Sequence, residues 1–136
     1  MRIEIRPASA ADVAAVLALW ERAAEPTTTD TADAVAALLT RVPGALLVAE
    51  ESGEIVGTVI AAWDGWRGSV YRLAVAPGQR RRGLGRRLLA AAEARLHGLG
   101  AHRMHAIVIG DDHRAVGFWQ ASDWEHQDGQ LRFVRS

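Results

Sequence analysis

The N-terminal part of the chain has the pattern of a strand followed by a helix. Apolar and polar residues alternate over residues 2–6, which is typical of a half-buried strand. Residues 9–25 then place alanine, valine, leucine and tryptophan at helical spacing. Ser9 with Asp12 three positions later is a near match to a capping box, so we expect the first helix to begin there.

A second, shorter helix is predicted next. Asp30 and Asp33 repeat the start signature ahead of the apolar run AVAALLTRV. Pro43 and Gly44 follow this run, and both residue types commonly end helices. The second helix should therefore stop near Val42.

The following apolar runs predict three strands in succession. Residues 45–63 form two such runs, separated by the Ser-Gly pair at 52–53, which is typical of a tight hairpin. The Asp-Gly pair at 64–65 provides another turn before the run at 69–75. Because these connections are short, the three strands should be antiparallel neighbours.

The longest helical pattern begins after Pro77 and stops at Gly98 and Gly100. The apolar positions that recur at helical spacing within it are Leu84, Leu88, Leu89, Ala92 and Leu96. We expect these five residues to form the buried stripe of the helix.

The last third of the chain predicts a strand at 103–109, a helix from about 112 to 121, and two short strands within 124–134 around a turn at 128–129. The complete order is β-α-α-β-β-β-α-β-α-β-β, an α/β (α+β) arrangement. No repeat, linker or low-complexity tract interrupts it. A single domain over residues 1–136 is the expectation.

Composition agrees with one globular domain. The 136 residues suffice for one core, and 49% hydrophobic with 24% charged residues is ordinary globular composition. The N-terminus lacks the charged and then apolar pattern of a signal peptide, and the longest apolar run, residues 13–20, is far shorter than a membrane span. We therefore expect a cytoplasmic protein without a membrane partner.

Missing residue types exclude several classes of function. Cysteine is absent, which excludes disulfides, thiolate metal sites and cysteine nucleophiles. All 16 basic residues are arginine, and without lysine neither a Walker A loop nor a Schiff base can form. The sequence has no G-x-S-x-G motif of serine hydrolases, and its five histidines lack paired metal-ligand spacing. No metal site is expected.

The segment PGQRRRGLGRRLL, residues 77–89, places five arginines around Gly83 and Gly85 in a chain of zero formal net charge. It falls at the join between a predicted strand and the long helix, where the first N–H groups have no partner inside the helix. Glycine lets a phosphate approach the backbone, the helix dipole adds positive charge, and arginine binds phosphate oxygens. The segment therefore favours a diphosphate as its ligand.

Three other interpretations of this segment are weaker. The dinucleotide fingerprint G-x-G-x-x-G needs a third glycine where Leu88 stands, and a βαβ repeat is missing. Nucleic-acid binding is disfavoured by the equal numbers of acidic and basic residues, 16 each, and by the lack of an aromatic sheet motif. A merely solvated helix start is disfavoured because glycine inside a helix costs about 1 kcal/mol.

Residues 80–85, which read R-x-x-G-x-G after LAVAP and before an amphipathic helix, resemble the acyl-CoA-binding motif Q/R-x-x-G-x-G/A of the GNAT N-acetyltransferase superfamily. The predicted order of elements resembles the GNAT fold over nearly the whole chain. LWER at 19–22, VGTV at 56–59 and the segment 64–71 are similar to the YpeA-like bacterial group. The resemblance implies a mixed, mostly antiparallel central sheet with helices on both faces.

The resemblance also implies acetyl-CoA as co-substrate and places its binding residues. These are Leu73, Ala74, Val75, Arg80, Arg81, Arg82, Gly83, Leu84, Gly85, Arg86, Asp112 and Phe118. In the family, the fourth strand pairs with the pantetheine arm, and the N–H groups of 81–86 would cradle the pyrophosphate here. The strands at 69–75 and about 103–109 would part around the thioester, with the Val75 N–H polarising its carbonyl.

The family's second motif, roughly N-x-x-A-x-x-F-Y-x-x-x-G-F, is similar to residues 112–124 with departures. Asp112 replaces Asn, Trp119 replaces Tyr, and Asp123-Trp124 replaces Gly-Phe. In many members the Tyr hydroxyl protonates the departing CoA thiolate, whereas an indole N–H can only donate a hydrogen bond. The thiolate would then leave with help from water or such a bond. Asp123 tolerates the positive φ that the replaced glycine suggests.

A general base must take the proton of the acceptor amine, and the sequence leaves its identity open. The candidates are Tyr71, Asp64, His105 and Glu50, and Tyr71 ranks first because it belongs to the YpeA-like match. Some family members carry glutamate where Ile107 stands. His105 can also be read as a partly buried strand histidine and Asp64 as a turn residue.

The leading hypothesis is an N-acetyltransferase that moves acetyl directly to the primary amine of a small molecule or peptide in a ternary complex. An acyl-CoA sensor without turnover is the alternative, suggested by Trp119 and the unassigned base. Trp63 or Trp66, beside the 64–65 turn, would line the acceptor site. No nucleic-acid partner is expected, and an exposed strand edge would allow a homodimer.

Overall fold

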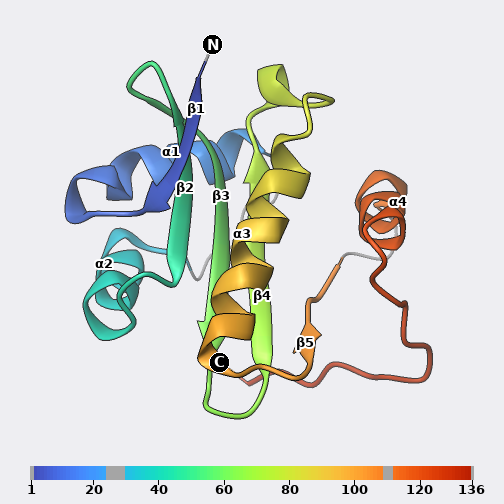
Figure 1. Cartoon of the computed structure of the whole chain (residues 1–136). Helices are drawn as coiled ribbons and strands as arrows, with labels where there is room; N and C mark the ends of the chain where they lie inside the picture. The colour runs from blue at the N-terminus through green and yellow to red at the C-terminus, as the bar shows by residue number, and fades with distance from the viewer. Residues whose placement is uncertain (1, 24–29, 109–111, 136) are drawn as a thin grey trace. The chain divides into compact units, whose positions relative to one another are not determined.

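The computed structural model describes residues 2–23, 30–108 and 112–135. The chain forms two compact units, Met1–Ala106 and Ile107–Ser136. The first unit contains a sheet with its covering helices, and the second contains one helix with the segment that follows it (Figure 1).

A five-stranded sheet organises the first unit. Its strands are β1 (Ile3–Pro7), β2 (Leu46–Glu51), β3 (Glu54–Trp63), β4 (Gly68–Val75) and β5 (Met104–His105). They lie side by side in sequence order. β1 to β4 pair antiparallel, whereas β5 runs parallel to β4. The predicted mixed, mostly antiparallel sheet is thereby confirmed.

The helices match the predicted spans closely. They are the 3-10 turns η1 (Ala10–Asp12) and η2 (Pro77–Gln79) and the helices α1 (Val13–Arg22), α2 (Ala32–Arg41), α3 (Leu84–Leu99) and α4 (His113–Ala121). The buried residues of α3 are Leu84, Leu88, Leu89, Ala92 and Leu96, the five that the spacing predicted.

Helices cover both faces of the sheet. Neighbouring residues of a strand point to opposite faces, so two consecutive residues of β3 show which helix covers each face. A Cβ placed on Gly57 of β3 would lie 2.8 Å from Leu88, so this position faces α3. The next residue, Thr58, accepts a hydrogen bond from the Trp20 indole of α1 at 2.9 Å. Figure 1 shows α3 running along β3 and β4. This arrangement confirms the predicted helices on both faces.

Both predicted turns are present. Ser52 and Gly53 adopt φ values of 53° and 81° between β2 and β3, as a two-residue hairpin with two left-handed positions requires. Between β3 and β4, the Asp64 carboxylate accepts the N–H groups of Trp66 and Arg67, each at 2.7 Å. Short-range turn chemistry therefore determines how β2, β3 and β4 are connected.

The start of α2 differs in detail from the prediction. Thr31, rather than Asp30, is its N-cap, and the Thr31 hydroxyl accepts the Ala34 N–H at 3.1 Å. Both residue types can cap a helix, and Thr31 has the extended backbone of an N-cap, with φ −107° and ψ 162°. The predicted end near Val42 is confirmed, since α2 stops at Arg41.

The predicted strands of the last third are largely absent from the described residues. β5 spans two residues instead of the predicted 103–109, of which position 109 lies outside the described residues. Residues 124–127 and 130–135 form no strand, although a turn occurs at 128–129. Alternation predicts which side chains share a face, but a strand also needs a neighbour that pairs its N–H and C=O groups. Leu131 and Phe133 are exposed here.

An ionic cluster connects the N-terminal strand to the start of α1. Arg6 contacts the carboxylates of Asp12 at 2.8 Å and Glu50 at 2.6 Å. Asp12 also accepts the Ser9 N–H at 2.8 Å, which confirms the predicted capping contact. Hydrogen bonding to Arg6 lowers the pKa of Asp12 from 3.8 to about 2.

None of the described helices is long and apolar enough to cross a membrane. The cytoplasmic location remains a prediction.

Asp12→Asn should lower the free energy of unfolding by about 1 to 2 kcal/mol at pH 7. The Asp12 pKa is depressed in the folded state, so its contribution is present above pH 4 and is lost as pH falls toward 2. Urea unfolding at several pH values should therefore show the difference from wild type closing in acid. Glu54→Gln, which alters an exposed carboxylate nearby, is the control. A difference that stayed constant down to pH 2 would contradict the assignment.

Candidate functional site

β4 changes register against β3 in its middle. Thr58 pairs with Ala74, but Ile60 pairs with Tyr71, so two residues of β4 stand opposite one of β3. This is a β-bulge, and Arg72 within it has a φ of 51°. A left-handed conformation is unfavourable for a residue with a side chain, so surrounding contacts must hold it.

One edge of β4 is open within the first unit. β4 pairs with β5 at Gly68–Met104 and Ser69–His105, and among the described residues of this unit no strand pairs with 70–75 on the side away from β3. This agrees with the predicted parting of the fourth and fifth strands. The backbone of Leu73, Ala74 and Val75, predicted to bind the pantetheine arm, lies along this edge.

The register fixes the direction of the Val75 amide. The Ala76 N–H donates to the Val56 carbonyl at 2.9 Å, which makes Gly57 and Val75 a non-hydrogen-bonded pair. The Val75 N–H therefore points away from β3, toward the open edge. A hydrogen-bond acceptor lying along this edge could reach it.

β4 leads through η2 to the N-terminus of α3. Gly83 is the N-cap with a φ of 77°, and a Cβ added to it would meet no atom within 4 Å. The first helical hydrogen bond runs from the Arg87 N–H to the Gly83 carbonyl at 3.1 Å. The N–H groups of Leu84 and Gly85 thus belong to the first turn, whose amides point out of the helix start. The glycine at 83 leaves this surface open to an anion.

The arginines of this segment differ in their surroundings. Arg82 contacts the buried carboxylate of Glu51 at 3.4 Å and also donates to the Gln79 side chain. Gln79 in turn donates to Glu51 at 2.9 Å. Arg81 is exposed and has a φ of 66°. Arg82 therefore fastens the loop to β2, while Arg81 projects from it.

A buried cluster behind the bulge was not found by sequence reasoning. The Trp20 indole donates to the Thr58 hydroxyl, which donates to the Arg72 carbonyl, both at 2.9 Å. The Arg72 guanidinium lies 4.9 Å from the Trp20 ring and forms an ion pair with Asp30. Trp20 and Thr58 lie in the segments LWER and VGTV, which could have signalled the cluster.

Tyr71 and His105 occur on the α1 side of the sheet. Ser69 and Tyr71 are two positions apart and precede the bulge, so their side chains share a face. The Ser69 hydroxyl lies 3.0 Å from the His105 Nε2, across the β4–β5 pairing. Tyr71 is 47% exposed, whereas Ser69 is buried. Two of the predicted bases therefore lie on one face, where β4 and β5 part.

The other two predicted bases have structural partners. The Asp64 carboxylate accepts the backbone N–H groups of Arg67 and Trp66 in its turn. These hydrogen bonds, of which the one from Arg67 has the larger effect, lower the pKa of Asp64. A lowered pKa makes a carboxylate a weaker base. Glu50 is ion-paired with Arg6. These contacts favour the turn interpretation of Asp64 that the sequence had left open.

The two tryptophans flanking the turn point in different directions. Trp63 lies 4.0 Å from the position of a Cβ on Gly100, the residue that caps the end of α3, so it contacts the α3 face. Trp66 is 68% exposed, and the Arg67 guanidinium lies 3.9 Å from its ring centre. Of the two, Trp66 is the more exposed to solvent.

The second unit contains the remaining predicted residues. Asp112 caps α4 by accepting the Ala115 N–H at 3.0 Å. Trp119 packs edge-on against Phe118 at 5.8 Å and Trp124 at 4.7 Å between ring centres. Asp123 has a φ of 66°, which confirms the positive φ anticipated at this glycine-like position. Trp119 thus belongs to an aromatic cluster within this unit.

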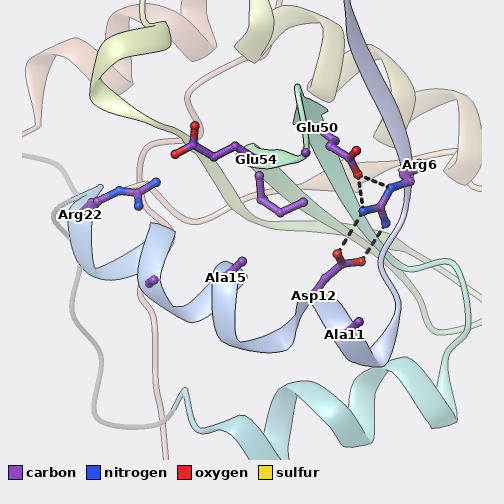
Figure 2. A pocket seen from close by; sticks show the side chains of 10 residues that line it. Arg6, Ala11, Asp12, Ala15, Arg22, Glu50 and Glu54 are labelled. Atoms are coloured by element: carbon purple, nitrogen blue, oxygen red, sulfur yellow. Dashed lines mark hydrogen bonds and ion pairs between the residues drawn. The ribbon is translucent and has the colours of Figure 1, made fainter.

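A hollow of about 400 Å³ lies between β1, α1 and the β2–β3 hairpin. Figure 2 shows the Arg6 guanidinium bound between Asp12 and Glu50 on its wall, with Arg22 and Glu54 farther along. Three carboxylates face two guanidinium groups, so the hollow does not attract a diphosphate. None of the residues predicted to bind CoA lines it.

Among residues 2–23, 30–108 and 112–135, no three histidine or carboxylate side chains gather in a way that could hold a metal ion.

Residues 13–123 match the acetyltransferase (GNAT) family. An acetyltransferase of Pectobacterium atrosepticum is 36% identical over 128 residues, covering 93% of this chain and 90% of that protein. An acetyltransferase of Sodalis glossinidius is 33% identical over 131 residues, covering 95% and 92%.

Solved structures of low sequence identity share the fold. The aminoglycoside acetyltransferase AAC(6')-Iy, in complex with a bisubstrate analogue, has a TM-score of 0.80 at 18% identity, covering 100% of this chain and 99% of that one. Ard1 from Thermoplasma volcanium has a TM-score of 0.81 at 20% identity, covering 89% and 81%. The family match and the two bacterial relatives, together with the open edge of β4, settle the family. The chain belongs to the acetyltransferase (GNAT) family and is an acetyl-CoA-dependent N-acetyltransferase.

Proposed function

We propose that the protein transfers the acetyl group of acetyl-CoA directly to the primary amine of a small molecule or peptide, with both substrates bound together. The amine nitrogen forms a bond to the thioester carbon, the carbon–sulfur bond breaks, and CoA leaves as the thiolate. The amine must be neutral to attack, so its proton goes to a base. A covalent cysteine intermediate is excluded because the chain has no cysteine.

The open edge of β4, continuous with the N-terminus of α3, carries this proposal. The Val75 N–H points toward that edge, where it can donate to a thioester carbonyl and stabilise the charge that develops on its oxygen. The amides that begin α3 suit a diphosphate at the end of the same path. A single extended ligand with a carbonyl at one end and a diphosphate at the other fits this order.

Side chains of the loop would supply the charge that a diphosphate needs. We assign this role to Arg80 and Arg81, because Arg82 already contacts Glu51. Arg82 contributes by holding the loop in place through Glu51 and Gln79.

We assign the base to His105, with Tyr71 beside it on the acceptor side. An imidazole is the side chain whose ordinary pKa lies nearest neutral pH, which suits proton transfer from an amine. When the His105 Nε2 donates its proton to the buried Ser69 hydroxyl, Nδ1 carries the lone pair that accepts a proton. The sequence ranked Tyr71 first, and the contact with Ser69 is the reason for preferring His105.

No tyrosine is available at the family position to protonate the departing thiolate, since Trp119 stands there. We propose that water assists its departure, while the roles expected from the resemblance for the Trp119 indole, Asp112 and Phe118 stay predictions. We also propose that residues 1–136 act as a single functional domain and that the protein belongs to the YpeA-like group. The group is supported by Trp20 of LWER bonding to Thr58 of VGTV.

An amine acceptor is supported by proteins of the same fold. One structure of AAC(6')-Iy contains a CoA-S-monomethyl-acetylneamine analogue, and a soil metagenomic aminoglycoside acetyltransferase was solved with sisomicin. These ligands belong to those proteins, and their low identity to this chain leaves its acceptor to be identified by screening.

Titration calorimetry should show micromolar binding of acetyl-CoA, with no comparable binding of ATP or NAD. CoA release should then follow when amines, including aminoglycosides, polyamines and peptides, are supplied. Equal binding of acetyl-CoA, ATP and NAD would show that the loop at residues 80–86 binds anions without specificity. Acetyl-CoA binding without turnover on a broad amine panel would contradict the proposed transfer to a primary amine.

Gly83→Ala should weaken acetyl-CoA binding about tenfold or more, because a methyl group would enter the open surface where we place the diphosphate. Gly53→Ala is the matched control, since Gly53 has a φ of 81° and equally open surroundings in the β2–β3 turn. Both variants carry a similar conformational cost of about 1 kcal/mol. If both left the dissociation constant for acetyl-CoA unchanged, the diphosphate would lie elsewhere.

His105→Gln should lower kcat/KM for the acceptor by about 100-fold or more, because the amide cannot take the proton of the amine. Glutamine can still hydrogen bond to Ser69, so the effect reports on proton transfer. Tyr71→Phe should retain most of the activity across pH 6 to 9. If the two variants exchanged these outcomes, the base would be Tyr71.

A further inference from the structure

The bulge of β4 is held from behind by a buried chain of two hydrogen bonds. The Trp20 indole N–H donates to the Thr58 hydroxyl at 2.9 Å, and this hydroxyl donates to the Arg72 carbonyl at 2.9 Å. Thr58 is fully buried. Because the indole N–H is only a donor, the threonine oxygen accepts from it, and the threonine proton is directed to the carbonyl.

The carbonyl that receives this bond belongs to the strained residue. Arg72 has a φ of 51°, a conformation that costs a non-glycine residue free energy. Without a partner, the backbone at this point could return to ordinary strand geometry, which would remove the extra residue from the bulge. The Thr58 hydroxyl opposes this change by fixing the carbonyl of Arg72.

The bulge also determines which amides reach the open edge. One residue inserted into a strand shifts the alternation of N–H directions for the residues that follow it. In the observed register the Val75 N–H points to the edge. Loss of the bulge would shift that alternation by one residue and turn the Val75 N–H toward β3.

We infer that Thr58 is a positioning residue for acetyl-CoA. Its hydroxyl, oriented by the Trp20 indole, maintains the bulge at Arg72, and this bulge directs the Val75 amide toward the open edge of β4. The inference rests on the proposed donor site along β4. Thr58 lies on the opposite face of the strand pair from α3 and acts through Arg72 rather than by touching acetyl-CoA.

Threonine offers well-matched variants for the test. Thr58→Val keeps the shape of the side chain and removes the hydroxyl, whereas Thr58→Ser keeps the hydroxyl. Val48→Ala is the structural control, because Val48 is fully buried on β2 as the cross-strand neighbour of Thr58 and is not part of β4. Thermal unfolding of each variant measures its general loss of stability.

Acetyl-CoA binding by calorimetry is the primary measurement, followed by kcat and KM. Thr58→Val should raise the dissociation constant for acetyl-CoA about tenfold and lower kcat. Thr58→Ser should remain within about threefold of wild type, and Val48→Ala should melt earlier but bind normally. If Thr58→Val does not fold, Thr58→Ala, which also removes the hydroxyl, should weaken acetyl-CoA binding more than Val48→Ala does.

The outcomes separate this inference from the proposed function. If wild type binds acetyl-CoA and the valine or alanine variant binds equally well, the role of Thr58 is overturned and the donor site stands. The role is also overturned if binding falls in Val48→Ala to the same extent. If wild type itself fails to bind acetyl-CoA, both the donor site and this inference are wrong.

Discussion

Pairing of β3 with β4 is the constraint on which the rest of the structure depends. β3 packs against α1 on one side and α3 on the other, so its alternating side chains position both helices. The same strand sets the register of β4, including the bulge at Arg72. The open edge of β4 and the direction of the Val75 amide follow from that register. The pairing of β3 with β4 therefore determines both how the helices pack and which way the Val75 amide points.

Arginine has two roles in this lysine-free chain. Arg6, Arg82 and Arg95 join segments that are distant in sequence: Arg6 bonds to two carboxylates, Arg82 to Glu51, and Arg95 to the Ala61 carbonyl at 3.3 Å. A planar guanidinium suits such contacts because it presents several donors at once. Arg81 projects from the loop that begins α3. A chain without net charge can thus still concentrate positive charge at one point.

Much of the fold could be predicted from local pattern because its elements are regular and its turns are short. The buried stripe of α3 and the glycine-containing turns at 52–53 and 64–65 depend on neighbouring residues, and they occur as predicted. The strands predicted within 124–134 were wrong for the described residues, since alternation cannot supply a pairing partner. The candidate site divides similarly: the loop with Gly83 has a local motif, whereas the Ser69–His105 contact has none.

The sequence by itself determined the family resemblance and the absence of cysteine and lysine chemistry, and it predicted anion binding by residues 80–86. These follow from residue type and spacing, which need no knowledge of distant contacts. Only the tertiary structure decided that Arg82 contacts Glu51 and that the Thr58 hydroxyl donates to the Arg72 carbonyl. The partners lie 31 and 14 residues apart in sequence. Such pairs meet only after the sheet has formed, because backbone hydrogen bonding, and not local preference, sets which residues face each other.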